Sequence, residues 1–212
     1  MTIHQLIFSP TGGTKRVSDF ISQGIGIESV VTELCVKASD LRLPEIKEDD
    51  LVIIAMPVFA GRVPAMAVER LRMAKPNNAK CAVVAVYGNR AFDDALLEMQ
   101  DVATEMGFRV IAAVAAVAEH SIVRRYGNAR PDADDEATLR QFGADILRKA
   151  ADNDLKVPQV PGNRPYKNLA WCRTLKANVA ATAAAFAQHN ALPTPSRSTI
   201  PRPWTPPNAS RA

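Results

Sequence analysis

The sequence has few of the residues that build disulfide frameworks, metal centres or membrane spans. Its three cysteines, Cys35, Cys81 and Cys172, lie far apart and show neither CxxC spacing nor an even count, so we predict free, buried thiols. No run reaches eighteen apolar residues, and the first residues show no basic region followed by a cleavage site. These absences predict a cytoplasmic protein without a membrane partner.

Acidic residues are absent after Asp154. All 22 Asp and Glu residues lie at or before that position, together with 18 of the 26 Lys and Arg residues, so residues 1–154 carry a net charge of −4 and the remainder +8. Nine of the fifteen prolines also follow Asp154. We therefore predict a domain over 1–154, a linker over 155–167, and an Ala-rich helix with a Pro-rich tail over 168–212. Because the basic residues of the last part are widely spaced with few aromatics between them, we expect no nucleic acid as a partner.

Apolar runs alternate with amphipathic stretches through residues 1–154, which is typical of parallel strands covered by crossover helices. The runs 51–56 and 82–87 are nearly all apolar, as expected of strands buried on both faces. The pattern predicts an α/β fold in which a helical crossover follows each of five strands, although the second crossover, 39–50, is short and polar. Strands are expected over 3–8, 30–36, 51–56, 82–87 and 110–117, and helices over 14–23, 65–74, 93–106 and 134–151.

A loop rich in small residues, Ser-Pro-Thr-Gly-Gly-Thr at 9–14, follows the first strand. Its glycines tolerate unusual dihedral angles, so several backbone N–H groups can converge, and the N-terminus of the following helix adds partial positive charge. The hydroxyls of Ser9, Thr11 and Thr14 supply further donors. Neither the Walker A pattern nor the dinucleotide fingerprint is present. The loop indicates either a site for a phosphate monoester or a Ser/Thr cap after a Gly-rich turn.

This loop resembles that of the flavodoxin family, whose first loop reads approximately [ST]-x-T-G-x-T and holds the phosphate of FMN. The resemblance covers residues 1 to about 154 and includes two further segments, MPVFAGRVP at 56–64 and YGNRAFDD at 87–94, which follow the third and fourth strands. It implies a three-layer sandwich with a five-stranded parallel sheet of order 2-1-3-4-5 and FMN as cofactor. All three loops leave carboxyl ends of strands, where ligands of open α/β sheets bind.

The flavin ring system needs an apolar slot and polar groups along its pyrimidine edge. Phe59 and Tyr87 are the stacking candidates and Phe92 a third, and the alternative for each is packing into the core. Flavodoxins commonly place Trp and Tyr here, so Phe59 departs from the family pattern. The resemblance implies that a peptide near Ala60 and Gly61 presents a carbonyl to the reduced N5–H of the flavin. The residues expected at the cofactor are Ser9, Thr11, Gly12, Gly13, Thr14, Pro57, Phe59, Ala60, Gly61, Tyr87, Gly88, Asn89 and Phe92.

Other polar residues near these loops admit two interpretations. Arg62 and Arg90 either face an anionic partner or are solvated. The Glu-His-Ser segment 119–121 follows the fifth strand. Adjacent side chains of an extended segment point to alternate faces, so these three do not converge on one substrate atom and we assign them no catalytic role. A similar segment occurs in flavodoxin-like relatives fused to ferredoxins, which leaves a contact to a partner or flavin edge beside a structural hydrogen-bonding role.

In such fusions the linker leads into the ferredoxin motif C-x2-C-x2-C-x3-C-P. This sequence lacks the motif, so no iron-sulfur cluster is expected. In a shifted reading frame, however, an alanine codon preceded by thymine is read as a cysteine codon. Ala181, Ala184, Ala187 and Ala191 have the spacing of the four ligands. We hypothesise that a frameshift removed a cluster-binding module, and the encoding DNA decides the matter.

These observations favour an FMN protein that transfers electrons between redox partners, either ferredoxin-like proteins or reductases. No acid-base, nucleophilic or metal-binding constellation is expected. One alternative is an FMN-dependent NAD(P)H reductase, in which Arg62, Arg124 and Arg125 would bind the second nucleotide. Another is a flavin-free interaction module built on the same fold.

Overall fold

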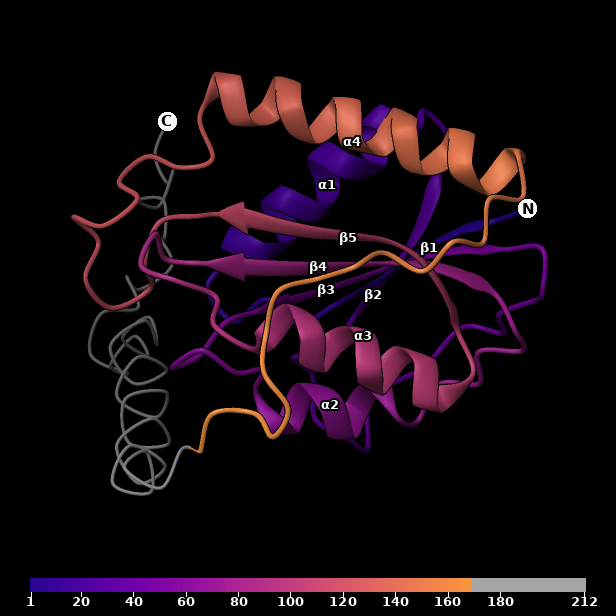
Figure 1. Ribbon diagram of the computed structural model, residues 1–212, viewed down its shortest axis with the longest axis horizontal. Coiled ribbons are helices and arrows are strands. Elements are labelled where there is room, and N and C mark those ends of the chain that lie inside the picture. The colour runs from indigo at the N-terminus through magenta and orange to yellow at the C-terminus, as the bar shows by residue number, and fades with distance from the viewer. Residues whose placement is uncertain (169–212) are drawn as a thin grey trace, which may run out of the picture. The chain divides into compact units, whose positions relative to one another are not determined.

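A computed structural model describes residues 1–168 (Figure 1). The predictions for the Ala-rich helix, the Pro-rich tail, Cys172 and the four alanines lie outside the described residues. In chain order the elements are β1 (Ile3–Ile7), α1 (Gly13–Ile25), β2 (Ser29–Glu33), β3 (Leu51–Pro57), α2 (Ala65–Leu71), β4 (Lys80–Tyr87), α3 (Ala95–Met106), β5 (Arg109–Val117) and α4 (Ala133–Ala151). The five strands and four helices whose residue ranges were predicted from the sequence are present, with ends that differ by a few residues.

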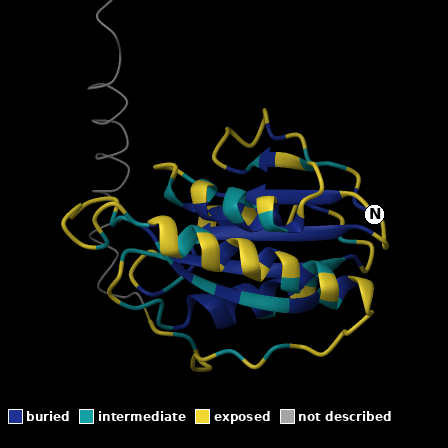
Figure 2. Cartoon of the chain, turned by 90° about the horizontal axis from the view of Figure 1, so that it is seen from above, coloured by how far each residue is buried: buried dark blue, intermediate teal, exposed yellow. Residues whose placement is uncertain are grey.

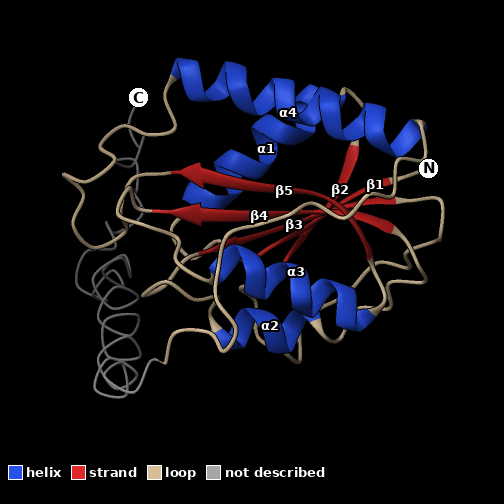
Figure 3. Ribbon diagram, in the orientation of Figure 1, coloured by secondary structure: helices blue, strands red, loops and turns tan. Residues whose placement is uncertain are grey.

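The five strands form one parallel sheet in the order β2-β1-β3-β4-β5, which confirms the predicted order. Helices α1 and α4 cover one face and α2 and α3 cover the other, so the domain has three layers (Figures 1 and 3). Because β1 lies between β2 and β3, the chain crosses from β1 to β2 on one side and then back past β1 to β3 on the other. This reversal is the switch point at which open α/β sheets leave a crevice.

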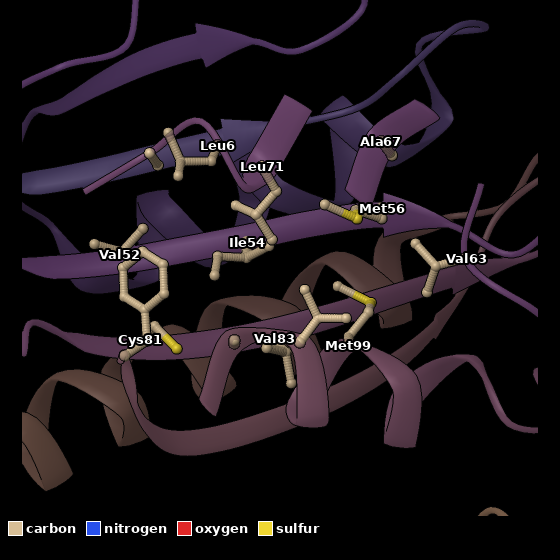
Figure 4. Packing of buried hydrophobic residues seen from close by; sticks show 14 of the residues in the cluster. Leu6, Val52, Ile54, Met56, Val63, Ala67, Leu71, Cys81, Val83 and Met99 are labelled. Atoms are coloured by element: carbon tan, nitrogen blue, oxygen red, sulfur yellow. The ribbon is translucent and has the colours of Figure 1, made fainter. Parts of the chain in front are cut away.

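The apolar run of β3 explains why both faces of the sheet are covered. Its successive side chains point to opposite faces, so Val52 and Ile54 pack with α2 and α3, whereas Leu51 and Ile53 pack with α1 and α4. All four are fully buried. Figure 4 shows the first of these two clusters, in which side chains of the central strands meet those of α2 and α3.

One expectation about the crossovers was wrong. Within the described residues no helix connects β2 to β3, so a helix follows four of the five strands. Within the predicted crossover 39–50, Leu41 and Ile46 are the buried apolar residues, and Pro44 lies between them. Two anchors make no apolar stripe for a helix to bury, and a proline inside a helix removes a backbone donor.

The prediction of buried thiols holds for one cysteine and fails for another. Cys81 in β4 is fully buried, whereas Cys35 is exposed. Cys35 follows β2, which is an edge strand with a neighbour on one side only, so little of the fold covers it.

Residues 155–168, which we call the strap and which include the predicted linker 155–167, form no helix or strand and lie against the domain. The strap follows α4 and returns along α3, where Gln100 Nε2 donates to the Pro158 carbonyl at 2.9 Å (Figure 1). Farther along, a Cβ on Gly162 would lie 2.7 Å from the Cβ of Leu97. These contacts make residues 1–168 one compact unit. Figure 2 shows that much of the strap's outer surface is exposed.

Helices α1 and α4 approach each other at two glycines. A Cβ on Gly24 would lie 1.9 Å from the carbonyl oxygen of Arg140, and one on Gly143 would lie 2.1 Å from the carbonyl oxygen of Ile21. Glycine inside a helix costs about 0.5–1 kcal/mol relative to alanine, so the close contact explains its use here.

The variant Gly143→Ala tests this contact. Helix propensity alone would raise the free energy of unfolding by about 0.5–1 kcal/mol. Overpacking against the α1 backbone lowers it by about 1–3 kcal/mol, so we expect a net loss in urea unfolding. Ala137→Gly on the exposed side of α4 is the control, with a loss of about 1 kcal/mol from propensity. A more stable Gly143→Ala protein would contradict the contact.

Candidate functional site

The three loops named from the sequence meet at one edge of the sheet. Backbone hydrogen bonds join the strand ends: Phe8 N–H donates to the Ala55 carbonyl at 3.0 Å, and Val58 N–H donates to the Val86 carbonyl at 2.8 Å. A third bond, 3.0 Å long, runs from Ala118 N–H to the Tyr87 carbonyl. In Figure 1 this edge is marked by the arrowheads of β4 and β5.

The first loop leaves the start of α1 open. Gly12 caps the helix with a left-handed backbone, φ 86°, and supplies no side-chain hydrogen bond. In the first turn the N–H of Lys15 donates to Ser9 Oγ, so the N–H groups of Gly13 and Thr14 are the ones left for a ligand. A Cβ at Gly12 would meet no atom of the described part of the chain within 4 Å. The first turn, which begins Gly-Thr-Lys, also contains no carboxylate. Exposed N–H groups, open space and no competing negative charge fit a bound phosphate.

Ser9 links the first loop to α1 and to the segment after β2 by hydrogen bonds. Its Oγ accepts a 2.9 Å hydrogen bond from the Lys15 N–H, and its own N–H donates to Cys35 Sγ at 3.0 Å. Since Oγ acts as the acceptor, its proton remains available for an anion. Partial desolvation of its sulfur, the largest cause, raises the pKa of the otherwise exposed Cys35, so the thiol is uncharged beside the loop. Thr11 is exposed and Thr14 is buried, so Thr11 offers the more accessible hydroxyl.

The second loop forms a tight hairpin turn over residues 59–62. Phe59 N–H donates to the Arg62 carbonyl at 2.9 Å, and Arg62 N–H returns a bond of 3.1 Å. The two central residues both have positive φ, 54° at Ala60 and 86° at Gly61, as a type I′ turn requires. Phe59 remains 38% exposed, which leaves its ring available for stacking.

The hairpin turn packs onto the third loop. The Gly61 carbonyl accepts a 3.1 Å bond from Asp94 N–H, and a Cβ on Gly61 would lie 2.2 Å from Asp93 Oδ2. Glycine is needed at 61 for this approach as well as for its φ. Of the two peptides expected to present a carbonyl, at Ala60 and Gly61, the carbonyl of Gly61 is therefore already engaged. Pro57, the last residue of β3, leads into this loop and is partly buried.

The two aromatic residues of the third loop differ in whether they are available for stacking or packed into the core. Tyr87 and Phe92 contact each other edge to face, with ring centroids 5.4 Å apart. Phe92 packs against the core, whereas Tyr87 is half-buried at the end of β4. A Cβ on Gly88 would lie 2.5 Å from His120 Cδ2, so glycine here makes room for the imidazole. Asn89 is exposed with φ 61°.

Arg62 neither faces an anionic partner nor is solvated, so both interpretations of this residue were wrong. Its guanidinium forms a bidentate pair with Glu98, with Nε and Nη2 each 2.7 Å from a carboxylate oxygen. It also donates to the Lys167 carbonyl at 2.9 Å and lies 4.7 Å from the Tyr166 ring centroid. The hydrogen bonds to Glu98 raise the pKa of Arg62. Sequence spacing did not reveal this pair because Glu98 belongs to α3. Arg90, by contrast, is well exposed and pairs with Asp93.

The Glu-His-Ser segment has a hydrogen-bonding role within its loop. His120 Nδ1 accepts from the N–H groups of Ile122 and Val123, each at 3.1 Å. Glu119 pairs with Arg124 at 2.5 Å and accepts from Ala129 N–H. These bonds order the loop after β5, and His120 supports Gly88 in the third loop.

Sequence reasoning missed Asp94. Its carboxylate is 3% exposed and accepts three hydrogen bonds from the strap: 2.8 and 3.2 Å from the N–H and Nδ2 of Asn163, and 2.6 Å from Lys167 N–H. The bond from Lys167, more than any other contact, lowers the pKa of Asp94. Its donors lie about 70 residues along the chain, and the only local signal was an acidic pair before a helix.

Comparison with known proteins identifies the fold. Neither models of protein families nor curated proteins match the chain. Among solved structures, a flavone reductase matches with a TM-score of 0.53 at 14% identity, over 76% of this chain and 66% of that one. The Flv1 flavodiiron core from Synechocystis matches with a TM-score of 0.50 at 13% identity, over 72% and 36%. A flavodoxin from the domain Archaea gives 0.48 at 20% identity, over 71% and 99%.

The sheet order and the first two similarities define a protein of the flavodoxin-like fold. Within the residues that the structure describes, no helix combines the length and the apolar character that a membrane span needs.

The carboxylate of Asp94 makes a testable contribution to stability. Because folding lowers its pKa, the ionised form is favoured in the native state, and this contribution is complete above about pH 4 and is lost as the pH falls through the lower folded value. We expect Asp94→Asn to lower the free energy of unfolding by about 1–3 kcal/mol at pH 7, as measured by urea unfolding.

The difference between Asp94→Asn and the parent protein should shrink as the pH falls below about 4, since asparagine does not titrate. Asp40→Asn, at an exposed position, is the matched control and should leave the profile nearly unchanged. A difference that stays constant or grows toward low pH would contradict the role of the Asp94 charge.

Proposed function

We propose that this chain binds FMN at the carboxyl edge of its sheet and transfers electrons between redox proteins. The observation that carries the proposal is the open start of α1, where Gly12 caps the helix beside the hydroxyls of Ser9 and Thr11 at the β1/β3 switch point. An anion is favoured at such a site by the unpaired N–H groups and the helix dipole. The fold is one in which other proteins carry flavin, which supports the proposal by analogy.

The phosphate would be held by neutral donors. The backbone N–H groups around Gly12, Gly13 and Thr14 and the hydroxyls of Ser9 and Thr11 supply them, while the nearby ammonium of Lys15 pairs with Asp19 at 2.7 Å. Neutral donors fixed by the backbone bind a phosphate through geometry more than through net charge.

The ring system would lie between the second and third loops. Phe59 supplies an exposed aromatic face and Tyr87 a half-buried one. The Ala60 carbonyl would accept from the reduced N5–H, and Asn89 would bond the pyrimidine edge. The isoalloxazine supplies the reversible redox chemistry, and these residues bind it, orient it and limit its contact with water.

Electron transfer is favoured over hydride transfer from a nicotinamide. Of the three arginines expected to bind a second nucleotide, Arg62 is held by Glu98 in a partly buried pair, and Arg124 and Arg125 make surface contacts with Glu119 and the Tyr126 ring. We infer that the partners are ferredoxin-like proteins or reductases, that nucleic acid and membranes are not partners, and that the chain acts in the cytoplasm.

We further propose that the chain descends from a flavodoxin-ferredoxin fusion whose cluster-binding part was lost to a frameshift. The spacing of four alanines at 181, 184, 187 and 191 supports this origin. Sequencing the encoding DNA tests it, because a thymine must precede each of the four codons. Another base before any of them would rule out the proposed origin.

Phosphate recognition is tested by titrating the protein with FMN and with riboflavin, which lacks the phosphate. Ser9→Ala and Thr11→Val each remove one hydroxyl donor to a charged group, so we expect FMN affinity to fall by about 1.5–3 kcal/mol each. Riboflavin affinity should change little, because the ring contacts remain. Flavin absorbance or fluorescence quenching measures both.

Thr104→Val, an exposed threonine on α3, is the matched control and should leave both affinities unchanged. Equal losses for FMN and riboflavin, or no loss for FMN, would remove the loop from its assigned role. Rapid bleaching of bound flavin by NADPH without an added reductase would favour the reductase instead. A parent protein that binds neither flavin would leave the flavin-free interaction module.

A further inference from the structure

We propose that the strap positions the flavin-ring side of the site, because it joins the hairpin turn 59–62 to the third loop through Asp94 and Arg62. This inference rests on the proposed FMN site and concerns residues that the resemblance to flavodoxins does not include. The strap lies outside the region of that resemblance, which ends near residue 154.

Asp94 is the first of the two joints. Its carboxylate accepts N–H groups from Asn163 and Lys167 of the strap, while its own N–H donates to the Gly61 carbonyl at 3.1 Å. Its carbonyl accepts the 2.9 Å bond from Glu98 N–H at the start of α3. One buried residue therefore ties the strap, the hairpin turn and α3 together.

Arg62 is the second joint. It closes the hairpin turn through its backbone, and its guanidinium reaches Glu98 of α3 and the Lys167 carbonyl of the strap. The Tyr166 ring lies against that guanidinium, and its hydroxyl donates to Asp101. Arg164 also pairs with Asp101, so α3 fixes the strap where it meets Arg62.

These contacts are confined to the ring side. Among the described residues, hydrogen bonds from the strap to other elements reach α3 and the second and third loops, and none reaches residues 9–14. Loosening the strap should therefore disturb Phe59 and the Ala60 carbonyl while the phosphate loop keeps its geometry. Flavin affinity and potential both depend on such ring contacts.

The test uses the full chain with Arg164→Ala and Tyr166→Ala combined, which removes the strap's side-chain contacts to Asp101 and Arg62. Lys156→Ala combined with Val157→Ala is the matched control, because both positions lie in the strap and are exposed. Hydrogen exchange of backbone amides in the flavin-free protein reads the loops directly. Titration with FMN and riboflavin, and the midpoint potential of bound FMN, read the ring site.

We expect faster amide exchange at Phe59, Arg62 and Asp94 in the first variant and unchanged exchange in the control. FMN and riboflavin affinities should fall by the same factor, about tenfold, so that their ratio stays constant while the midpoint potential shifts. A variant that only lost overall stability would speed exchange throughout the sheet and leave the potential of bound FMN unchanged.

Three results would overturn the inference. These are unchanged exchange at residues 59–62, unchanged riboflavin affinity and potential despite faster exchange, and a loss confined to FMN. A parent protein that binds no flavin would instead refute the proposed function, and the assignment of the strap to a flavin ring with it. In that case the exchange data alone would still decide whether the strap holds the two loops.

Discussion

The parallel pairing of β1 with β3 is the constraint on which the rest of the site depends. Ile3 lies opposite Leu51 and Ile7 opposite Ala55, so the two strands begin together and β3 ends two residues after β1. Since β1 also pairs with β2 on its other side, the crossovers diverge and leave the carboxyl ends open. The start of α1 and the hairpin turn 59–62 therefore lie at the same edge, one with free N–H groups and the other with an exposed aromatic ring.

Fixed dipoles dominate the phosphate side of this site, because most charges near the loops are paired within the chain. Arg62 is neutralised by Glu98 and Arg90 by Asp93, while Lys15 is paired with Asp19. When a phosphate binds to fixed backbone N–H groups, no mobile Lys or Arg side chain has to lose its water. Salt also screens such contacts less than it screens interactions between exposed charges. The strap adds a restraint of a similar kind to the ring side, since Asp94 is held chiefly by backbone N–H groups.

Much of the architecture was readable from the sequence because its signals are local. The apolar runs 51–56 and 82–87 identify central strands, and the loop 9–14 identifies the turn between the first strand and a helix. The resemblance to flavodoxins then gave the sheet order. The short, polar crossover 39–50 already indicated that no helix would follow the second strand. Counting alternating segments alone led to the wrong expectation of a helix after every strand.

The remaining features depend on pairings that no local pattern encodes. Glu98 meets Arg62 because α3 turns one face toward the second loop, and Asn163 meets Asp94 only after the chain has passed through β5 and α4. The exposure of Cys35 follows from the edge position of β2, which is a property of the sheet and not of the strand. Periodicity reports which face of an element is buried, but not which partner that face will meet.

The central claim is that a phosphate binds the open start of α1, and backbone amide chemical shifts measured during titration with FMN test it most directly. The account predicts large shifts for the amides of Thr11, Gly12, Gly13 and Thr14, with smaller ones around Phe59. Amides at the opposite edge of the sheet, such as those of Asp50 and Ala79, should not move. Shifts that leave residues 11–14 unchanged, or that cluster at another surface, would contradict it.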